Sequence, residues 1–167
     1  MTSNPKKYFR LLAISPSASG FGFIVLEGTD TLADWGTKGA RKDKNKCCIS
    51  HAEKLIRKYE PNALVLYDHA INPRRSERIR TLNSGFVDLA RTHKLKVKLF
   101  PRAEVDHVFF PQGGATKYKI AKLIAERVSD ELAAMLPPER RAWNPEHRRM
   151  DIFDAFALAV TFRRCVD

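Results

Sequence analysis

The chain has 167 residues, of which 44% are hydrophobic, and its 30 lysines and arginines outnumber 19 aspartates and glutamates to give a net charge of +11. This length suits one domain with a sizeable buried core, and no apolar run reaches the roughly 20 residues of a membrane span. We expect a single soluble, cytoplasmic domain over residues 1–167, because the N-terminus lacks the apolar core of a signal peptide and the three cysteines fit no disulfide framework. The basic excess favours nucleic acid as the partner.

The first forty residues predict an antiparallel meander. Apolar residues, alternating or continuous, indicate strands over Tyr8–Ser15 and Gly20–Gly28, and a third strand follows over Asp30–Lys38. Turns as short as those between them join neighbouring antiparallel strands. One polar residue, Ser15, stands where the first strand ends.

Helices and strands then alternate. The apolar spacing predicts helices and strands in this order: a helix from Cys47 to the stop at Pro61, a buried strand over Asn62–Ala70, a helix over Asn72–Lys94, a strand over Leu95–Phe100, a helix over Lys117–Pro137 and a last helix from Met150. Because the strand after the first helix returns parallel, this order predicts an α/β fold with a mixed sheet of about five strands, three antiparallel and two parallel, flanked by helices.

Asp151 and Asp154 are the sharpest chemical feature of the sequence. They lie three residues apart in the first turn of an otherwise apolar helix, so their side chains point from one face. Two carboxylates held this close repel each other unless a cation lies between them, and Mg²⁺ prefers such hard oxygen ligands. The alternative is that both residues stabilise the positive end of the helix dipole. The helix alone does not decide between these two roles.

Four segments bear on this choice: "LLAISPSASGFGFIVLEG", "PNALVLYDHAI", "GGATKYKIAKLIAERV" and "MDIFDAFALAVTFRR". In this order and spacing they resemble the characteristic segments of RuvC-type Holliday junction resolvases, which belong to the ribonuclease H-like superfamily. The resemblance runs from about Leu11 to about Arg164. It implies the five-stranded mixed sheet described above and a role in DNA recombination and repair. It also implies an active site in which four carboxylates hold two Mg²⁺ ions for phosphodiester hydrolysis.

Only half of that carboxylate set is present. The pair on the last helix carries over onto Asp151 and Asp154, but Ser15 stands at the first-strand aspartate and Tyr67 at the fourth-strand glutamate. A serine hydroxyl is a weak, neutral ligand, and a tyrosine stays protonated at neutral pH. We therefore expect Mg²⁺ to bind weakly or not at all. The adjacent Asp68 replaces Tyr67 only if the strand ends or bulges there, because neighbouring strand residues face opposite sides.

The positions around this set match the family unevenly. Lys117 matches the lysine that opens the family's next helix and is a candidate catalytic residue, although it also suits a solvated surface position. Ala70 stands where the family has a base-stacking aromatic residue, and Asp106 where it has a basic one. His69 and His147 fall near the expected site, where each either assists a metal or phosphate or simply lies on the surface.

Clustered basic residues are the candidates for nucleic-acid contact. Such side chains position DNA through its phosphates without reading sequence, and the alternative is that they only solvate loops. The candidates are Lys42, Lys44 and Lys46 in one loop, Arg74, Arg75, Arg78 and Arg80 before and within the second helix, and Lys117 and Lys119 at the start of a later one.

Three functions fit these residues. The first is a protein that binds branched or duplex DNA and whose metal-dependent nuclease activity is lost or impaired. The second is an active Mg²⁺-dependent Holliday junction endonuclease (a crossover junction endodeoxyribonuclease) that uses Asp68, Asp151 and Asp154, with help from His147. The third is a structural protein that uses neither DNA nor metal, which the net charge argues against. The family resemblance also implies a homodimer formed through the helix that spans Arg74 to Lys94.

Overall fold

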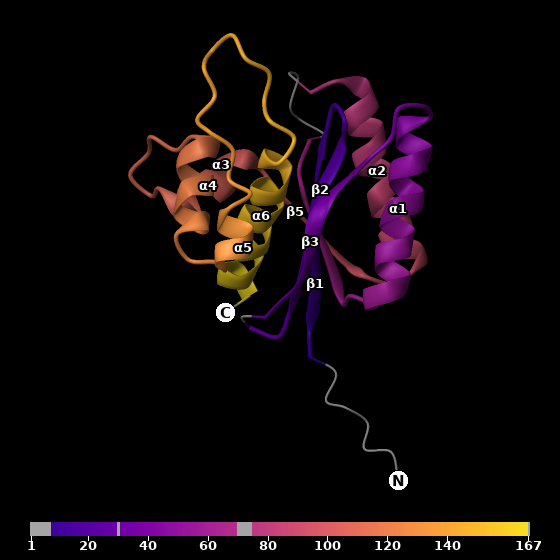
Figure 1. Cartoon of the computed structure of the whole chain (residues 1–167). Coiled ribbons are helices and arrows are strands. Elements are labelled where there is room, and N and C mark those ends of the chain that lie inside the picture. The colour runs from indigo at the N-terminus through magenta and orange to yellow at the C-terminus, as the bar shows by residue number, and fades with distance from the viewer. Residues whose placement is uncertain (1–7, 30, 70–74, 167) are drawn as a thin grey trace.

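The computed structural model describes residues 8–29, 31–69 and 75–166, and within them five strands form one mixed sheet (Figure 1). The strands are β1 (Arg10–Ser17), β2 (Gly20–Glu27), β3 (Thr31–Gly39), β4 (Ala63–Tyr67) and β5 (Lys96–Phe100). Their order in the sheet is β3-β2-β1-β4-β5. β1 pairs antiparallel with β2 and parallel with β4, while β3 extends the antiparallel half and β5 the parallel half. The predicted sheet is therefore confirmed, and β4 ends at Tyr67, before Asp68 and His69 of the expected strand.

Helices cover both faces of the sheet (Figure 1). One face carries α1 (Lys44–Tyr59) and α2 (Glu77–Thr92). The other carries α6 (Met150–Val166), against which α3 (Arg102–Phe109) and α4 (Lys117–Ala125) pack, with the short α5 (Asp130–Ala133) beside α4. No helix in the described ranges is long and apolar enough to cross a membrane.

The alternation of β1 connects the two layers of the core. Leu11 and Ala13 lie in the cluster that contains α6, whereas Leu12 and Ile14 lie in the cluster that contains α1 and α2. Both faces of β1 are therefore buried away from water, which is why its sequence is continuously apolar rather than alternating. By the same alternation Ser15 faces α6, on the side where the chemistry of the family resemblance is expected.

Two predictions between β5 and α6 are wrong. The helix expected over Lys117–Pro137 ends at Ala125, because Ser129 caps a new short helix by accepting a hydrogen bond from the Leu132 amide. The segment after Pro101, for which no helix was predicted, forms α3. This helix has only eight residues and one buried side chain, so its apolar period is too short to stand out in the sequence.

Gly22 in β2 allows the first turn of α6 to approach the sheet. It pairs with Ser15 across the β1–β2 ladder. A Cβ atom at this position would lie 2.3 Å from the carbonyl carbon of Asp151 and 2.6 Å from its Cβ atom. Only a residue without a side chain therefore lets Asp151 approach the sheet this closely next to Ser15.

We expect Gly22→Ala to destabilise the fold by about 2–3 kcal/mol, because the new methyl group meets helix backbone that cannot move independently. Urea unfolding measures this free energy. Gly36→Ala is the matched control in the same sheet, since its Cβ would lie 3.3 Å from a ring atom of Phe23, and we expect it to cost about 1 kcal/mol or less. Equal losses for the two variants would contradict the close approach at Gly22.

Candidate functional site

Four side chains meet where β1 and β4 end against the first turns of α6. β1 and β4 are parallel neighbours, so their carboxyl ends lie at the same edge of the sheet. Ser15 comes from β1, Tyr67 from the last position of β4, and Asp151 and Asp154 from α6. All four residues are buried. The positions that the family resemblance singled out are thus gathered in one place, with two carboxylates instead of four.

Two basic side chains pair with the Asp154 carboxylate. Arg102 on α3 places Nη1 3.4 Å from Oδ1, and Lys117 on α4 places Nζ 3.4 Å from Oδ2. The Asp154 side chain is only 6% exposed, so these contacts are weakly screened. The chain itself therefore supplies positive charge to both oxygens of this carboxylate.

Tyr67 is held as a neutral hydrogen-bond donor. Burial raises the pKa of its hydroxyl well above the ordinary value, and the nearby Asp154 charge adds to the shift. The protonated hydroxyl donates to the carbonyl oxygen of Asp154 at 3.2 Å and accepts from Arg102 at 3.3 Å. Asn83 on α2 donates to the Tyr67 carbonyl at 2.9 Å, which fixes the end of β4. Tyr67 therefore connects β4 to α6 and α3 without contributing a negative charge.

Sequence reasoning missed Arg102. The family resemblance drew attention instead to Asp106, at a position where the family has a basic residue. The Asp106 Oδ1 atom lies 3.0 Å from Arg102 Nε within α3. Burial lowers the pKa of Arg102, but Tyr67, Asp154 and Asp106 outweigh this and raise it above its usual value. The available signal was its position two residues after the end of β5, the strand parallel to β4, because such a residue lies at the same sheet edge as Tyr67.

The Asp151 carboxyl differs from that of Asp154, because within the described residues it forms no ion pair. Burial raises the pKa of its carboxyl to about 7, and the charges of Asp154 and Glu146 add to the shift, while the nearby Ser17 hydroxyl opposes it. Among the described residues neither Asp151 Oδ2 nor Ser17 Oγ has a hydrogen-bond partner. Near neutral pH this carboxyl is therefore protonated in a large fraction of molecules.

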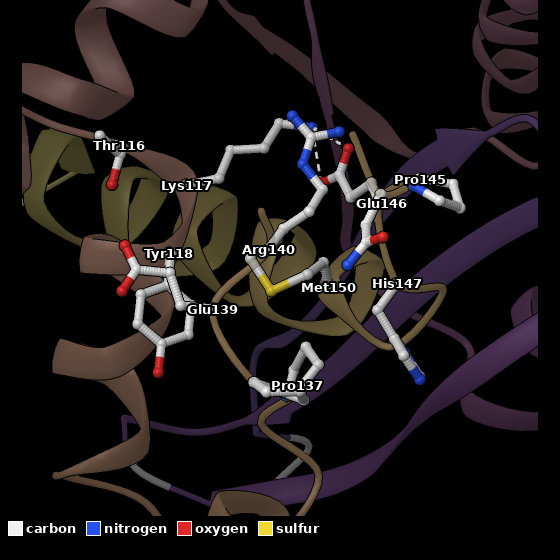
Figure 2. Close-up of a pocket in the computed structure, with 12 residues that line it drawn as sticks. Thr116, Lys117, Tyr118, Pro137, Glu139, Arg140, Pro145, Glu146, His147 and Met150 are labelled. Atoms are coloured by element: carbon white, nitrogen blue, oxygen red, sulfur yellow. Dashed lines mark hydrogen bonds and ion pairs between the residues drawn. The ribbon is translucent and has the colours of Figure 1, made fainter. Parts of the chain in front are cut away.

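Lys117 also binds the loop that precedes α6. Its Nζ atom lies 3.0 and 3.1 Å from the two carboxylate oxygens of Glu146, as Figure 2 shows. The Thr116 side chain caps α4 by accepting a hydrogen bond from the Lys119 amide, which fixes Lys117 at the first turn. A pocket of about 620 Å³ lies between α4 and this loop, and its lining includes Lys117, Arg140 and Glu146 (Figure 2). Glu146 was not predicted, because its contact depends on how the long loop between α5 and α6 folds back.

These residues fit the two-Mg²⁺ site that the family resemblance implies poorly. Within the described ranges there is no group of three or more His, Cys, Asp or Glu side chains that could hold a metal ion. The structure thus does not bring Asp68, Asp151, Asp154 and His147 together as such a group. Asp68 is half-buried just beyond β4, and its amide donates to the Phe100 carbonyl at 2.8 Å. The Asp154 carboxylate already contacts an ammonium and a guanidinium group.

The two histidines differ. His147 lies on the surface, where its Nδ1 atom accepts a hydrogen bond from the Arg149 amide at the start of α6. His69 is buried, so the surface position considered for it is wrong. Burial, to which the charge of Arg75 adds, lowers its pKa to about 4, so the ring is neutral at physiological pH. Within the described part of the chain its Nε2 atom has no hydrogen-bond partner.

The other basic candidates differ in what their side chains contact. Arg78 donates to the carbonyls of Ser17 and Ala18, and Lys44 donates to that of Ala18, so both support the β1–β2 turn. The candidates with exposed side chains are Lys42, Lys46, Arg80 and Lys119. Arg75 is partly buried and lies close enough to lower the pKa of Tyr67 and of His69.

Two expectations fall partly outside the described ranges. Arg74 and Ala70 belong to residues 70–74, which are not described. The helix expected to form a dimer begins at the Ser76 cap rather than at Asn72. Its exposed positions are polar or charged: Glu77, Arg80, Thr81, Ser84, Asp88, Arg91 and Thr92. The homodimer stays a prediction.

Comparisons with known proteins identify solved structures that share the fold of this chain. No protein-family model and no curated protein sequence matches the chain. Among solved structures, RuvC of Thermus thermophilus in complex with a Holliday junction substrate matches with a TM-score of 0.67 and 14% sequence identity, over 95% of this chain and 97% of that one. A further Thermus thermophilus RuvC structure matches with a TM-score of 0.64 and 12% identity, over the same shares. The chain therefore has the ribonuclease H-like fold of RuvC.

Proposed function

We propose that this protein binds branched or duplex DNA and that its metal-dependent nuclease activity is lost or impaired. The observation that carries the proposal is the pairing of Asp154 with Arg102 and Lys117, beside neutral residues at the first-strand and fourth-strand positions. The likeness in fold to a RuvC solved with a Holliday junction substrate supports DNA as the partner.

The electrostatics of the site oppose a divalent cation. Mg²⁺ gives up hydration water reluctantly and needs carboxylate charge in return. Ser15 and Tyr67 supply none, and the positive groups of Arg102 and Lys117 lie within 3.4 Å of the Asp154 oxygens. A cation at Asp154 would have to displace these groups and then remain close to them. Like charges at such short distances repel by several kcal/mol even at an intermediate dielectric constant of about 20.

The surface charge supports nucleic-acid binding independently of the site. The net charge is +11, and exposed lysines and arginines occur on several elements, including Lys46 on α1, Arg91 on α2 and Lys119 on α4. Each phosphate that such a side chain neutralises releases condensed counterions, which drives binding at low salt. A protein that binds by shape and phosphate contact needs no intact metal site.

With a fluorescently labelled four-way junction we expect binding in the micromolar range at about 50 mM salt, weakening roughly 10-fold or more by about 200 mM. Fluorescence anisotropy measures the affinity. The Lys42→Gln/Lys46→Gln chain removes two exposed lysines and should reduce the slope of log affinity against log salt by about two. In the same mixtures we expect no strand cleavage with Mg²⁺ or Mn²⁺ on denaturing gels.

Two other outcomes would contradict this proposal. Symmetric nicks that Asp154→Asn abolishes would establish the endonuclease instead. The features that favour that candidate are the unpartnered Asp151 Oδ2 among the described residues and the position of Asp68 just beyond the end of β4. Absence of binding even at low salt would exclude both DNA-binding candidates and leave a structural role.

A further inference from the structure

The loop that joins α5 to α6 presents an aromatic side chain to solvent. In Figure 1 this loop is the orange segment that rises beyond the end of the sheet. It carries Trp143, which is 75% exposed, the largest value for any large hydrophobic residue in the described ranges. One exposed apolar residue is ordinary on a protein surface, so exposure alone assigns no role. The residues around Trp143 indicate what the exposed ring binds.

Contacts hold the end of the loop that precedes α6, and prolines restrict its backbone. Before α6, Glu146 binds Lys117, and Arg148 lies against Gly39, where a Cβ atom would come within 2.6 Å of its Nη2 atom. Pro137 and Pro138 open the loop and Pro145 lies just before Glu146. Proline fixes φ, so these residues reduce the number of conformations open to the loop. An aromatic ring on a constrained loop loses little entropy when a ligand binds to it.

The loop is also basic. Residues 137–149 contain four arginines and two glutamates, and one glutamate is paired with Lys117. The guanidinium carbon of Arg141 lies 5.6 Å from the centre of the Trp143 ring, a cation–π contact that orients the ring. Arg140, Arg141 and Arg148 are exposed. A stacking surface surrounded by exposed arginines is the combination that proteins use to bind unpaired nucleotides.

Duplex DNA cannot stack a base on the Trp143 ring. Its bases are stacked on each other and offer their faces to no side chain, whereas an unpaired strand exposes them. The loop ends at Arg149, two residues before Asp151, which is the first of the buried pair Asp151 and Asp154. A strand bound to the loop would therefore lie beside the site at the carboxyl ends of β1 and β4.

We propose that the loop over residues 137–149 binds a single-stranded segment of nucleic acid, with a base stacked on Trp143 and the neighbouring phosphates on Arg140 and Arg141. This inference rests on the proposed function and deepens it, because it identifies unpaired strands at a branch point as the preferred part of the substrate. Duplex regions then bind elsewhere on the basic surface, through phosphates alone.

The test compares three labelled DNAs, an oligo(dT), a splayed-arm junction and a plain duplex, by anisotropy at low salt. Trp143→Ala should weaken binding of the oligo(dT) and the junction about 10-fold and leave duplex binding unchanged. Trp143→Phe should restore most of the affinity, because it keeps a stacking ring. Tyr8→Ala is the matched control, since Tyr8 is another exposed aromatic residue, 61% exposed, beside Gly28 at the opposite end of the molecule.

Fluorescence gives a second readout that needs no loss of affinity. The chain has two tryptophans, and Trp35 on β3 is replaced by phenylalanine so that Trp143 alone emits. Oligo(dT) should then quench the emission as it binds, because a stacked base shortens the excited-state lifetime. The salt dependence of oligo(dT) binding should be the same for Trp143→Ala as for the unaltered chain, since the indole neutralises no phosphate.

The outcomes separate this inference from the proposed function. If the unaltered chain binds duplex and junction but Trp143→Ala changes neither oligo(dT) binding nor emission, the loop has no such role and the proposed function stands. Equal losses on all three DNAs would also overturn stacking, because a duplex offers no base to the ring. If the unaltered chain binds none of the DNAs, the proposed function fails and this inference fails with it.

Discussion

The Asp151→Asn chain is expected to be more stable than the unaltered chain at pH 8 and about equally stable near pH 4. Burial raises the pKa of Asp151 from 3.8 to about 7. Between these two pH values the unfolded chain has released the proton while the folded chain retains it, so stability falls as the pH rises and levels off above pH 7. An amide has no charge to desolvate and escapes this loss. The difference at pH 8 should be roughly 2–4 kcal/mol in unfolding free energy.

Urea unfolding at several pH values between 4 and 8 measures this difference. Asp154→Asn is the matched control in the same helix, because its carboxylate is paired with Arg102 and Lys117 and an amide loses both ion pairs. We expect that variant to be less stable than the unaltered chain at pH 8. The two aspartates, three residues apart, should thus respond to the same substitution with opposite signs. A destabilised Asp151→Asn chain at pH 8 would show that a partner compensates this carboxylate in solution.

Arg102→Ala should destabilise the fold by about 2–3 kcal/mol. The substitution leaves Asp154, whose side chain is 6% exposed, with one cation instead of two, and it removes the donor to the Tyr67 oxygen. Removing one partner of a fully buried ion pair costs roughly 3–5 kcal/mol, and the 32% exposure of the Arg102 side chain lowers that value. The measurement is the unfolding free energy at neutral pH.

Asp106→Ala is the control for this prediction, because it breaks the other ion pair of the same arginine. Both side chains of that pair are 32% exposed, so its loss should cost less than about 1 kcal/mol. In an Asp154→Asn background Arg102→Ala should lower the unfolding free energy less than it does alone. The difference between the two losses is the coupling energy of the two residues. Arg102→Lys should restore little, since one ammonium cannot reproduce the planar contacts to both Tyr67 and Asp154. Purely additive losses would contradict the pairing.

The sheet could be predicted because each of its signals is local. Short turns between apolar runs specify the meander, and the continuous run at Ala63–Tyr67 indicates a strand buried on both faces. The pairing of Asp151 with Asp154 also follows from helix geometry. The ion pair of Asp154 with Arg102 could not be predicted, because Arg102 lies 52 residues before it in the sequence. Only the packing of α3 on α6 brings the two side chains together. The contact of Glu146 with Lys117 could not be predicted either, since a loop sequence has no periodicity that indicates its conformation.

The close pairing of Ser15 with Gly22 has a consequence for any attempt to rebuild a metal site. An aspartate at position 15 would face the first turn of α6, where Gly22 keeps the sheet and Asp151 close together. That carboxylate would join one neighbour already neutralised by a proton and another already neutralised by Arg102 and Lys117. A single substitution at position 15 would therefore add a buried charge that neither neighbour balances, and it would not by itself form a metal site. The residue at position 67 and the contacts of Asp154 would have to change with it, so the four positions are interdependent.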